Sequence, residues 1–143
     1  MSTRPMPDVL IVDDDDIDVM AVRRALAKAN VSPRTHVAHN GEEALALLDP
    51  DATSVKSPCI VLLDINMPRM NGFDFLDRIR NDERLHDLVV FMVSTSDAPE
   101  DRARAYRYNV AGYINKSLPD AKFHASVNML VDYCRVVQLP DTP

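Results

Sequence analysis

Short apolar runs alternate along the chain with longer segments whose apolar residues lie three or four positions apart. The first pattern is typical of buried strands and the second of amphipathic helices, because side chains repeat every two residues in a strand and about every 3.6 in a helix. The predicted strands occupy residues 9–12, 35–38, 59–63, 88–93 and 111–115. A helical segment follows each of them, so the sequence predicts a series of strand–helix units.

The predicted helices are marked by apolar stripes and by polar residues at their starts. In the first helix the stripe consists of Ile17, Met20, Ala21, Ala25, Leu26 and Ala29, and in the third of Phe73, Leu76 and Ile79. Three starts combine a capping position with a later acidic residue, a pattern that satisfies free backbone N–H groups. These pairs are Asn40 and Glu43, Asp97 and Glu100 around Pro99, and Ser117 and Asp120.

Regular alternation of strands and helices predicts one sheet of parallel strands covered by helices on both faces, since each crossover needs a helix and is right-handed in nearly all cases. The fold class is α/β, a doubly wound, flavodoxin-like (βα)5 domain. Five-stranded sheets of this kind favour the strand order 2-1-3-4-5, which makes the first and third strands neighbours. Ligands bind at the carboxyl ends of the strands in such sheets.

Composition narrows the class of protein. The 143 residues, 46% of them hydrophobic, fit a single domain over 1–143 with short tails at about 1–7 and 139–143. The two cysteines lie in apolar patterns, which indicates core packing in a cytoplasmic protein more than a disulfide framework. No apolar run is long enough to span a membrane. A net charge of −6 argues against a nucleic-acid partner.

Chemistry is concentrated where the predicted strands end. The third strand ends at Asp64, and Asp13 and Asp14 end the first, so in the predicted order these three carboxylates converge. Their mutual repulsion calls for a cation, and an oxygen-only ligand set selects a hard ion such as Mg²⁺. Ser94 and Lys116 end the fourth and fifth strands. A hydroxyl and a fixed positive charge at this edge suit a phosphoryl group attached to Asp64.

Four motifs resemble those of the receiver domain of two-component response regulators, over about residues 9–130. They are Val12-Asp13-Asp14, the stretch from Leu63 to Gly72 with Asp64-Ile65-Asn66-Met67-Pro68 at its start, Ser94-Thr95, and Gly112-Tyr113-Ile114-Asn115-Lys116. The resemblance implies a phosphoacceptor signalling protein, with no catalytic turnover beyond its own phosphorylation and dephosphorylation. The phosphoryl group would come from a phosphohistidine of a sensor histidine kinase.

The resemblance also implies a role for each site residue. Asp64 would accept the phosphoryl group, and Asp13, Asp14, Asp64 and the backbone carbonyl of Asn66 would hold Mg²⁺. Ser94 and Lys116 would bind the phosphoryl oxygens. Ser94 and Tyr113 would act in the switch of the fourth helix, fifth strand and fifth helix, in which Tyr113 would change rotamer. The side chains of Asn66 and Ser96 would tune autodephosphorylation.

One position departs from the family pattern. The family usually has proline after the lysine, following a cis peptide, and residue 117 is serine. A cis bond before a non-proline residue costs about 2.5–4 kcal/mol, so either the backbone is strained here or Lys116 approaches the site differently. The stretch from Thr95 to Ala98 and the end of the chain resemble the small stand-alone regulators of bacterial phytochrome kinases.

Other interpretations remain open for the same residues. Asp13 or Asp14 alone suits a helix cap, Lys116 a solvated surface position, and Ser94 or Tyr113 ordinary strand-end packing. A haloacid-dehalogenase-type phosphatase also uses an aspartate nucleophile with Mg²⁺, although the chain leaves no room for its cap domain. A flavodoxin would need Ser, Thr and Gly donors where this chain has four aspartates.

The last helix carries two apolar stripes. Its first stripe, Phe123, Val127, Leu130, Cys134 and Val137, has the spacing of a core-facing side. Met129, Tyr133 and Val136 form a second line that would face water in a monomer. This line predicts a homodimer through the last helix. The alternative is that it packs under the segment at Leu139 and Pro140.

Overall fold

The computed structural model describes residues 6–141. Strands and helices alternate through this part of the chain, as the apolar pattern predicts. The elements are β1 (Asp8–Val12), α1 (Asp16–Lys28), β2 (Thr35–Ala38), α2 (Gly41–Leu47), β3 (Cys59–Leu63), α3 (Gly72–Arg80), β4 (Val89–Ser94), α4 (Pro99–Arg107), β5 (Gly112–Asn115) and α5 (Asp120–Val136).

The five strands form one parallel sheet in the order β2-β1-β3-β4-β5, which confirms the predicted flavodoxin-like fold. β1 and β3 are neighbours, with Val12 opposite Leu63. On the other side of the sheet, Ser94 of β4 lies opposite Asn115 of β5. The residues that follow β1 and β3 therefore leave the sheet side by side.

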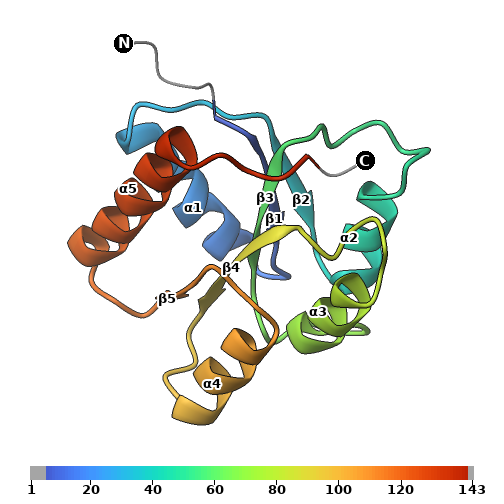
Figure 1. The fold of residues 1–143 in the computed structure, drawn as a ribbon. Helices are drawn as coiled ribbons and strands as arrows, with labels where there is room; N and C mark the ends of the chain where they lie inside the picture. Colours follow the sequence, from blue (N-terminus) through green and yellow to red (C-terminus); the bar gives the residue numbers. More distant parts are fainter. Residues whose placement is uncertain (1–5, 142–143) are drawn as a thin grey trace.

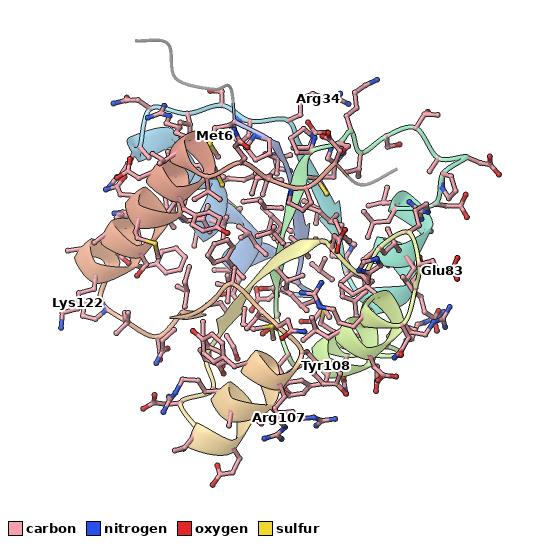
Figure 2. The ribbon with its side chains drawn as sticks, viewed as in Figure 1. Met6, Arg34, Glu83, Arg107, Tyr108 and Lys122 are labelled. Atoms are coloured by element: carbon pink, nitrogen blue, oxygen red, sulfur yellow. The ribbon has the colours of Figure 1, made fainter. Side chains whose placement is uncertain are left out.

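Helices cover both faces of the sheet (Figure 1), and alternate residues of each strand face opposite layers. In β4, Phe91 belongs to the layer of α1 and α5, whereas its neighbour Met92 belongs to the layer of α2, α3 and α4. Side chains fill the space between the sheet and the helices on each side (Figure 2). This packing gives the strand ends a rigid base.

The apolar face of α1 differs from the predicted one. Ile17 and Met20 are 73% and 59% exposed, whereas Val19, Val22, Ala25 and Leu26 are buried. Both sets of positions fit a helical spacing, and residues 17 and 19 point to nearly opposite sides of a helix. The sequence pattern alone therefore selected the wrong side at the start of α1, while Ala25 and Leu26 were predicted correctly.

Helix starts agree only in part with the capping predictions. Asn40 caps α2 by accepting a hydrogen bond from the Glu43 N–H at 2.9 Å, but Glu43 reaches back to the His39 N–H instead of that of Asn40. α4 begins with Pro99 in its first turn and has no side-chain cap. The predicted cap of α5 at Ser117 is wrong, because that helix begins at Asp120 after Pro119.

A single arginine fixes the loops at the amino end of β4. The Arg80 guanidinium donates hydrogen bonds to the carbonyl oxygens of Tyr108 (2.7 Å), His86 (2.8 Å), Leu88 (2.7 Å) and Asn109 (3.1 Å). Arg80 ends α3, and its partners lie in the loops before β4 and β5. One side chain thus ties together α3, the end of α4 and the start of β4.

The remaining expectations concern cysteines, membrane and chain ends. Cys59 and Cys134 are free, buried thiols, as predicted, and burial raises their pKa values to about 12 and about 11. Among residues 6–141, no helix has the length and hydrophobicity to span a membrane.

Residues 1–5 and 142–143 of the predicted tails lie outside the described residues. Met6 and Leu139 pack against the layer of α1 and α5.

Candidate functional site

Three carboxylates meet at the carboxyl edge of the sheet. Asp13 follows β1 directly and Asp64 follows β3, and the Asp64 N–H bonds to the Val12 carbonyl at 2.9 Å. Asp13, Asp14 and Asp64 each place one carboxylate oxygen so that the three lie within 4.8 Å of one another. Asp13 and Asp64 are buried, while Asp14 is exposed. These three carboxylates therefore lie together, as the sequence predicts.

The turn after β1 is ordered by its own aspartates. Asp13 accepts a hydrogen bond from the Asp15 N–H at 3.0 Å, and its own N–H bonds to the Ala38 carbonyl at 2.9 Å. Asp15 is the N-cap of α1, where it accepts a hydrogen bond from the Ile17 N–H at 2.9 Å. The capping role therefore belongs to Asp15, which leaves the Asp14 side chain available at the mouth of the site.

The loop after β3 packs tightly against the strand end because residue 72 has no side chain. A Cβ atom at Gly72 would overlap the Asp64 carbonyl oxygen and lie 3.0 Å from the Ile65 Cα. The Gly72 N–H instead bonds to the Ile65 carbonyl at 2.9 Å. Asn71 and Asp74 cap α3 reciprocally. The turn thereby holds the backbone of Asp64 in place.

Lys116 crosses the site from the end of β5. Its Nζ donates hydrogen bonds to Asp13 Oδ2 at 2.9 Å and to Asp18 Oδ2 at 2.8 Å, and lies 3.4 Å from Asp64 Oδ1. The lysine side chain is only 7% exposed. Lys116 is therefore a buried counter-ion, which excludes the alternative of a solvated surface lysine.

Asp18 is a site residue that the sequence analysis missed. It lies in the first turn of α1, away from any strand end. Its place in the site can be recognised only once the burial of Val19 and Val22 shows which side of α1 packs against α5. In sequence, Asp18 resembles any acidic residue of a helix start.

Burial and charge shift the protonation of the site. Burial raises the pKa of Asp64 to about 6, although Lys116 opposes this shift. Burial likewise raises the pKa of Asp13 above its ordinary value, against the hydrogen bond from Lys116. For Lys116, burial acts to lower the pKa, but hydrogen bonds to Asp18 and Asp13 outweigh it and the pKa is raised. The lysine is thus held charged beside carboxylates that resist ionisation.

Ser94, Ser96 and Tyr113 form a second hydrogen-bonded group beside the carboxylates. Ser94 is fully buried, and its Oγ accepts a hydrogen bond from the Ser96 N–H at 3.1 Å. The Ser96 Oγ donates to Asp101 at 2.6 Å, and the Tyr113 hydroxyl donates to the Ser96 carbonyl at 3.1 Å. Within residues 6–141, no hydrogen bond joins Ser94 or Ser96 to Asp64.

Asn66 and Ser117 flank the site. Asn66 is exposed, so its side chain faces solvent near Asp64 in the chain. Across residues 6–141, Ser57–Pro58 is the only cis peptide, so the peptide between Lys116 and Ser117 is trans. The Ser117 N–H and hydroxyl both donate to the Asn115 side-chain oxygen, the N–H at 2.8 Å. Lys116 therefore reaches the carboxylates without a cis peptide before residue 117.

Comparison with known proteins identifies the family. Residues 9–128 match the model of the response regulator receiver domain. The chain belongs to this family. Among the three interpretations that the sequence left open, this match selects the receiver domain over the phosphatase and the flavodoxin.

The proteins similar in sequence to this receiver domain include several that are named as regulators. It is 29% identical over 126 residues to the probable methanogenesis regulatory protein FilR2 of Methanothrix harundinacea, covering 87% of this chain and 81% of FilR2. It is 32% identical over 121 residues to the nitrate/nitrite response regulator NarL of Escherichia coli, covering 82% of this chain but only 51% of NarL. The receiver domain thus spans about half of the NarL chain.

A solved structure with a similar fold is that of the phosphorylated cyanobacterial phytochrome response regulator RcpA. The similarity has a TM-score of 0.82 at 27% identity, and it covers 94% of this chain and 99% of the RcpA chain. The predicted resemblance to stand-alone regulators of the phytochrome group is therefore confirmed at the level of family and fold.

Proposed function

We propose that this receiver domain accepts a phosphoryl group on Asp64 from a phosphohistidine of a sensor kinase, in a Mg²⁺-dependent reaction. The observation that carries the proposal is the meeting of Asp64 with the ammonium group of Lys116 and with the two other carboxylates. A phosphoryl group on Asp64 brings negative charge, and the Lys116 ammonium and a cation held by the carboxylates would neutralise that charge from several sides. A phosphohistidine of a sensor kinase is the phosphoryl donor expected for the receiver-domain family, to which the chain belongs.

The transfer is a substitution at phosphorus. An Asp64 carboxylate oxygen forms the new O–P bond while the P–N bond to the donor imidazole breaks. The imidazole leaves with the electron pair and takes up a proton. Lys116 and Ser94 bind the oxygens of the transferred group. These bonds become better oriented as the group reaches Asp64. Water later hydrolyses the acyl phosphate, and the Asn66 and Ser96 side chains tune that step.

The donor set fits Mg²⁺. Asp13, Asp14 and Asp64 supply oxygen ligands, and the backbone carbonyl of Asn66 completes the proposed set. Mg²⁺ prefers such oxygen ligands with several retained waters, and the exposure of Asp14 leaves one side of the cluster open to water. Bound Mg²⁺ would neutralise charge on Asp64 and on the incoming phosphoryl group.

The signal would be a shift in the packing of α4, β5 and α5. Ala105 is the sole residue of α4 that is buried in the described structure, so few apolar contacts hold this helix. Tyr113 bonds to the Ser96 carbonyl in the loop before α4. Movement of Ser94 toward the phosphoryl group would disturb Ser96 and release this tyrosine to change rotamer.

The test is phosphorylation by acetyl phosphate with Mg²⁺, followed by intact mass. The wild-type chain should gain one phosphoryl group, Asp64→Asn none, and Asp51→Asn, an exposed carboxylate control, the same as wild type. A chelator should stop labelling. Equal labelling of Asp64→Asn would place the phosphoryl group elsewhere, and undiminished labelling in chelator would remove the metal from the reaction.

The proposed partner is a sensor histidine kinase of the bacteriophytochrome type. Similarity to RcpA, a phytochrome response regulator, supports this choice. Since histidine kinases take their phosphoryl group from ATP, we place the protein in the cytoplasm, as its buried free thiols also favour. A profile of phosphotransfer from purified histidine kinases tests the partner, and faster transfer from a kinase without a phytochrome would overturn it.

Homodimerisation through α5 is a second proposal. Met129 and Val136 are 52% and 78% exposed, whereas Tyr133 is half-buried and packs edge-on against Phe91 with ring centroids 5.4 Å apart. Exposed apolar residues on one helix favour a contact between two copies. Leu139 and Tyr133 both pack against the layer of α1 and α5, whereas Met129 and Val136 stay exposed beside them.

Sedimentation at micromolar concentration tests the dimer. Met129→Glu should dissociate it, while the adjacent Asn128→Glu, also at an exposed position, should not. Tyr133 is a poor probe because its ring packs against Phe91 of the monomer core. A wild-type protein that sediments as a monomer would overturn the dimer.

A further inference from the structure

Asp18 makes the shortest of the three carboxylate contacts to Lys116. The Nζ–Oδ2 distance is 2.8 Å, compared with 2.9 Å to Asp13 and 3.4 Å to Asp64. An ammonium group has three N–H donors and no acceptor. Two of its bonds go to Asp18 and Asp13, so the residue that is to be phosphorylated has the weakest hold on the lysine.

Asp18 and Lys116 lie in different parts of the fold. Asp18 is in the first turn of α1, and Lys116 follows β5, 98 positions further along the chain. Their pair bridges α1 to the segment between β5 and α5. Asp18 is not one of the phosphoacceptor, metal or lysine positions that the family motifs assign in this chain. Its contact with Lys116 is therefore an addition to the site described above.

The surroundings of Asp18 allow the pair to separate. The Asp18 side chain is 30% exposed, whereas those of Lys116 and Asp64 are 7% and 9% exposed. A cavity of about 60 Å³ lies beside the pair, lined by Asp18, Ala21, Lys116, Leu118, Asp120 and Phe123. An Asp18 carboxylate that loses the lysine can therefore be hydrated, which a buried carboxylate cannot.

We propose that Asp18 is a positioning residue that restrains Lys116 in the resting protein and so limits how readily a phosphoryl group gains this cation. The inference rests on the proposed phosphorylation of Asp64. A phosphoryl dianion bound at Asp64 competes with Asp18 for the same ammonium protons. Loss of Asp18 removes the competitor and one negative charge near the incoming anion, and both changes favour binding of the donor.

The experiment measures the initial rate of Asp64 phosphorylation against acetyl phosphate concentration, at fixed Mg²⁺. In this assay an Asp64 oxygen forms the bond to phosphorus and acetate leaves with the electron pair. In Asp18→Asn the half-saturating acetyl phosphate concentration should fall by about three- to fivefold, the upper part of the effect expected for loss of one partly exposed ion pair. The maximal rate should change less, and Asp18→Glu should return the half-saturating concentration toward that of wild type.

The matched control is Asp120→Asn, which removes the same charge from the lining of the same cavity. It should leave the half-saturating concentration within about twofold of wild type, as is usual for surface substitutions. An unchanged value in Asp18→Asn, an increased one, or an equal decrease in Asp120→Asn would each overturn the inference, while labelling of wild type leaves the proposed function standing. A wild-type protein that is not labelled on Asp64 would overturn both.

Discussion

Lys116 and Asp13 are joined by a hydrogen bond of 2.9 Å, although they lie 103 positions apart in the chain. The bond spans the sheet, because Lys116 follows the edge strand β5 and Asp13 follows β1, with β3 and β4 between them. One long side chain thus connects strand ends that share no backbone hydrogen bond. The charge of that side chain balances carboxylates from both β1 and β3.

Replacement of Lys116 tests this balance. Lys116→Met leaves Asp13 and Asp64 buried without their cation, and removal of one partner of a buried pair costs about 3–5 kcal/mol of unfolding free energy. The loss should be largest near neutral pH in metal-free protein and smaller near pH 4, where Asp64 is protonated because its pKa is about 6. Urea unfolding measures it, with the exposed Lys122→Met as the control. Equal stability of the two variants at neutral pH would contradict the role of Lys116 as a counter-ion.

Asp64 gives the metal-free protein a specific pH dependence. Burial raises its pKa from 3.8 to about 6, so between these values the folded protein holds a proton that the unfolded chain has released. The contribution of Asp64 to stability therefore falls as the pH rises through this window, and is lowest above it. Asp64→Asn lacks this loss and should exceed wild type by roughly 1–3 kcal/mol above pH 6, converging with it near pH 4.

Thermal unfolding in chelator from pH 4 to pH 8 measures this difference, and Asp51→Asn should follow wild type throughout. The prediction fails if wild type gains stability relative to Asp64→Asn as the pH rises. Added Mg²⁺ should reduce or reverse the advantage of Asp64→Asn above pH 6, because bound cation stabilises the folded state with its ionised carboxylates.

Gly72 tests the backbone support of the site. In Gly72→Ala the new methyl group meets the backbone of Asp64 and Ile65, which cannot move without disturbing the strand end. We expect a loss of about 1–3 kcal/mol from overpacking, together with slower labelling of Asp64. Gly41→Ala is the matched control, because the atoms nearest to its methyl group would belong to the flexible Met70 side chain and not to backbone. A smaller loss of unfolding free energy for Gly72→Ala than for Gly41→Ala would contradict this account.

Arg80 should be sensitive to even a conservative change. Lysine cannot reproduce a planar guanidinium that serves four carbonyl groups in two loops. The bonds to Tyr108 and Leu88 are partly buried, and a buried acceptor left without a donor costs about 1–3 kcal/mol. Arg80→Lys should therefore lower the unfolding free energy by about 2 kcal/mol or more. The exposed Arg78→Lys, in the same helix, should change it by less than about 0.5 kcal/mol. Chemical denaturation of both variants compares them directly, and equal midpoints would refute the role of the guanidinium.

The strand ends could be predicted from sequence because they depend on a one-dimensional pattern. An apolar run that stops at Asp64 or Asp13 marks the end of a buried strand, and the strand order then brings the two together. The Lys116 position followed from the same rule. These predictions needed no knowledge of which way any helix faces.

The parts that sequence could not give depend on the rotation of helices and on local competition for hydrogen bonds. Residues 17 and 20 continue an apolar spacing, but the burial of Val19 and Val22 fixes α1 in another orientation, which turns Asp18 toward Lys116. Ser117 has the chemistry of a cap, yet it bonds to Asn115 and the helix starts later. Such choices are made by packing and by neighbours in space, and neither appears in a linear spacing.

Among residues 6–141, the sheet divides the interior into two layers that share no buried side chain, since alternate strand residues such as Phe91 and Met92 belong to different layers. A volume lost from one layer can be refilled only by a larger residue of the same layer. Over many generations, compensating substitutions should therefore pair α1 with α5, and α2 with α3 or α4, and seldom cross the sheet. The two halves of this interior are free to diverge at different rates.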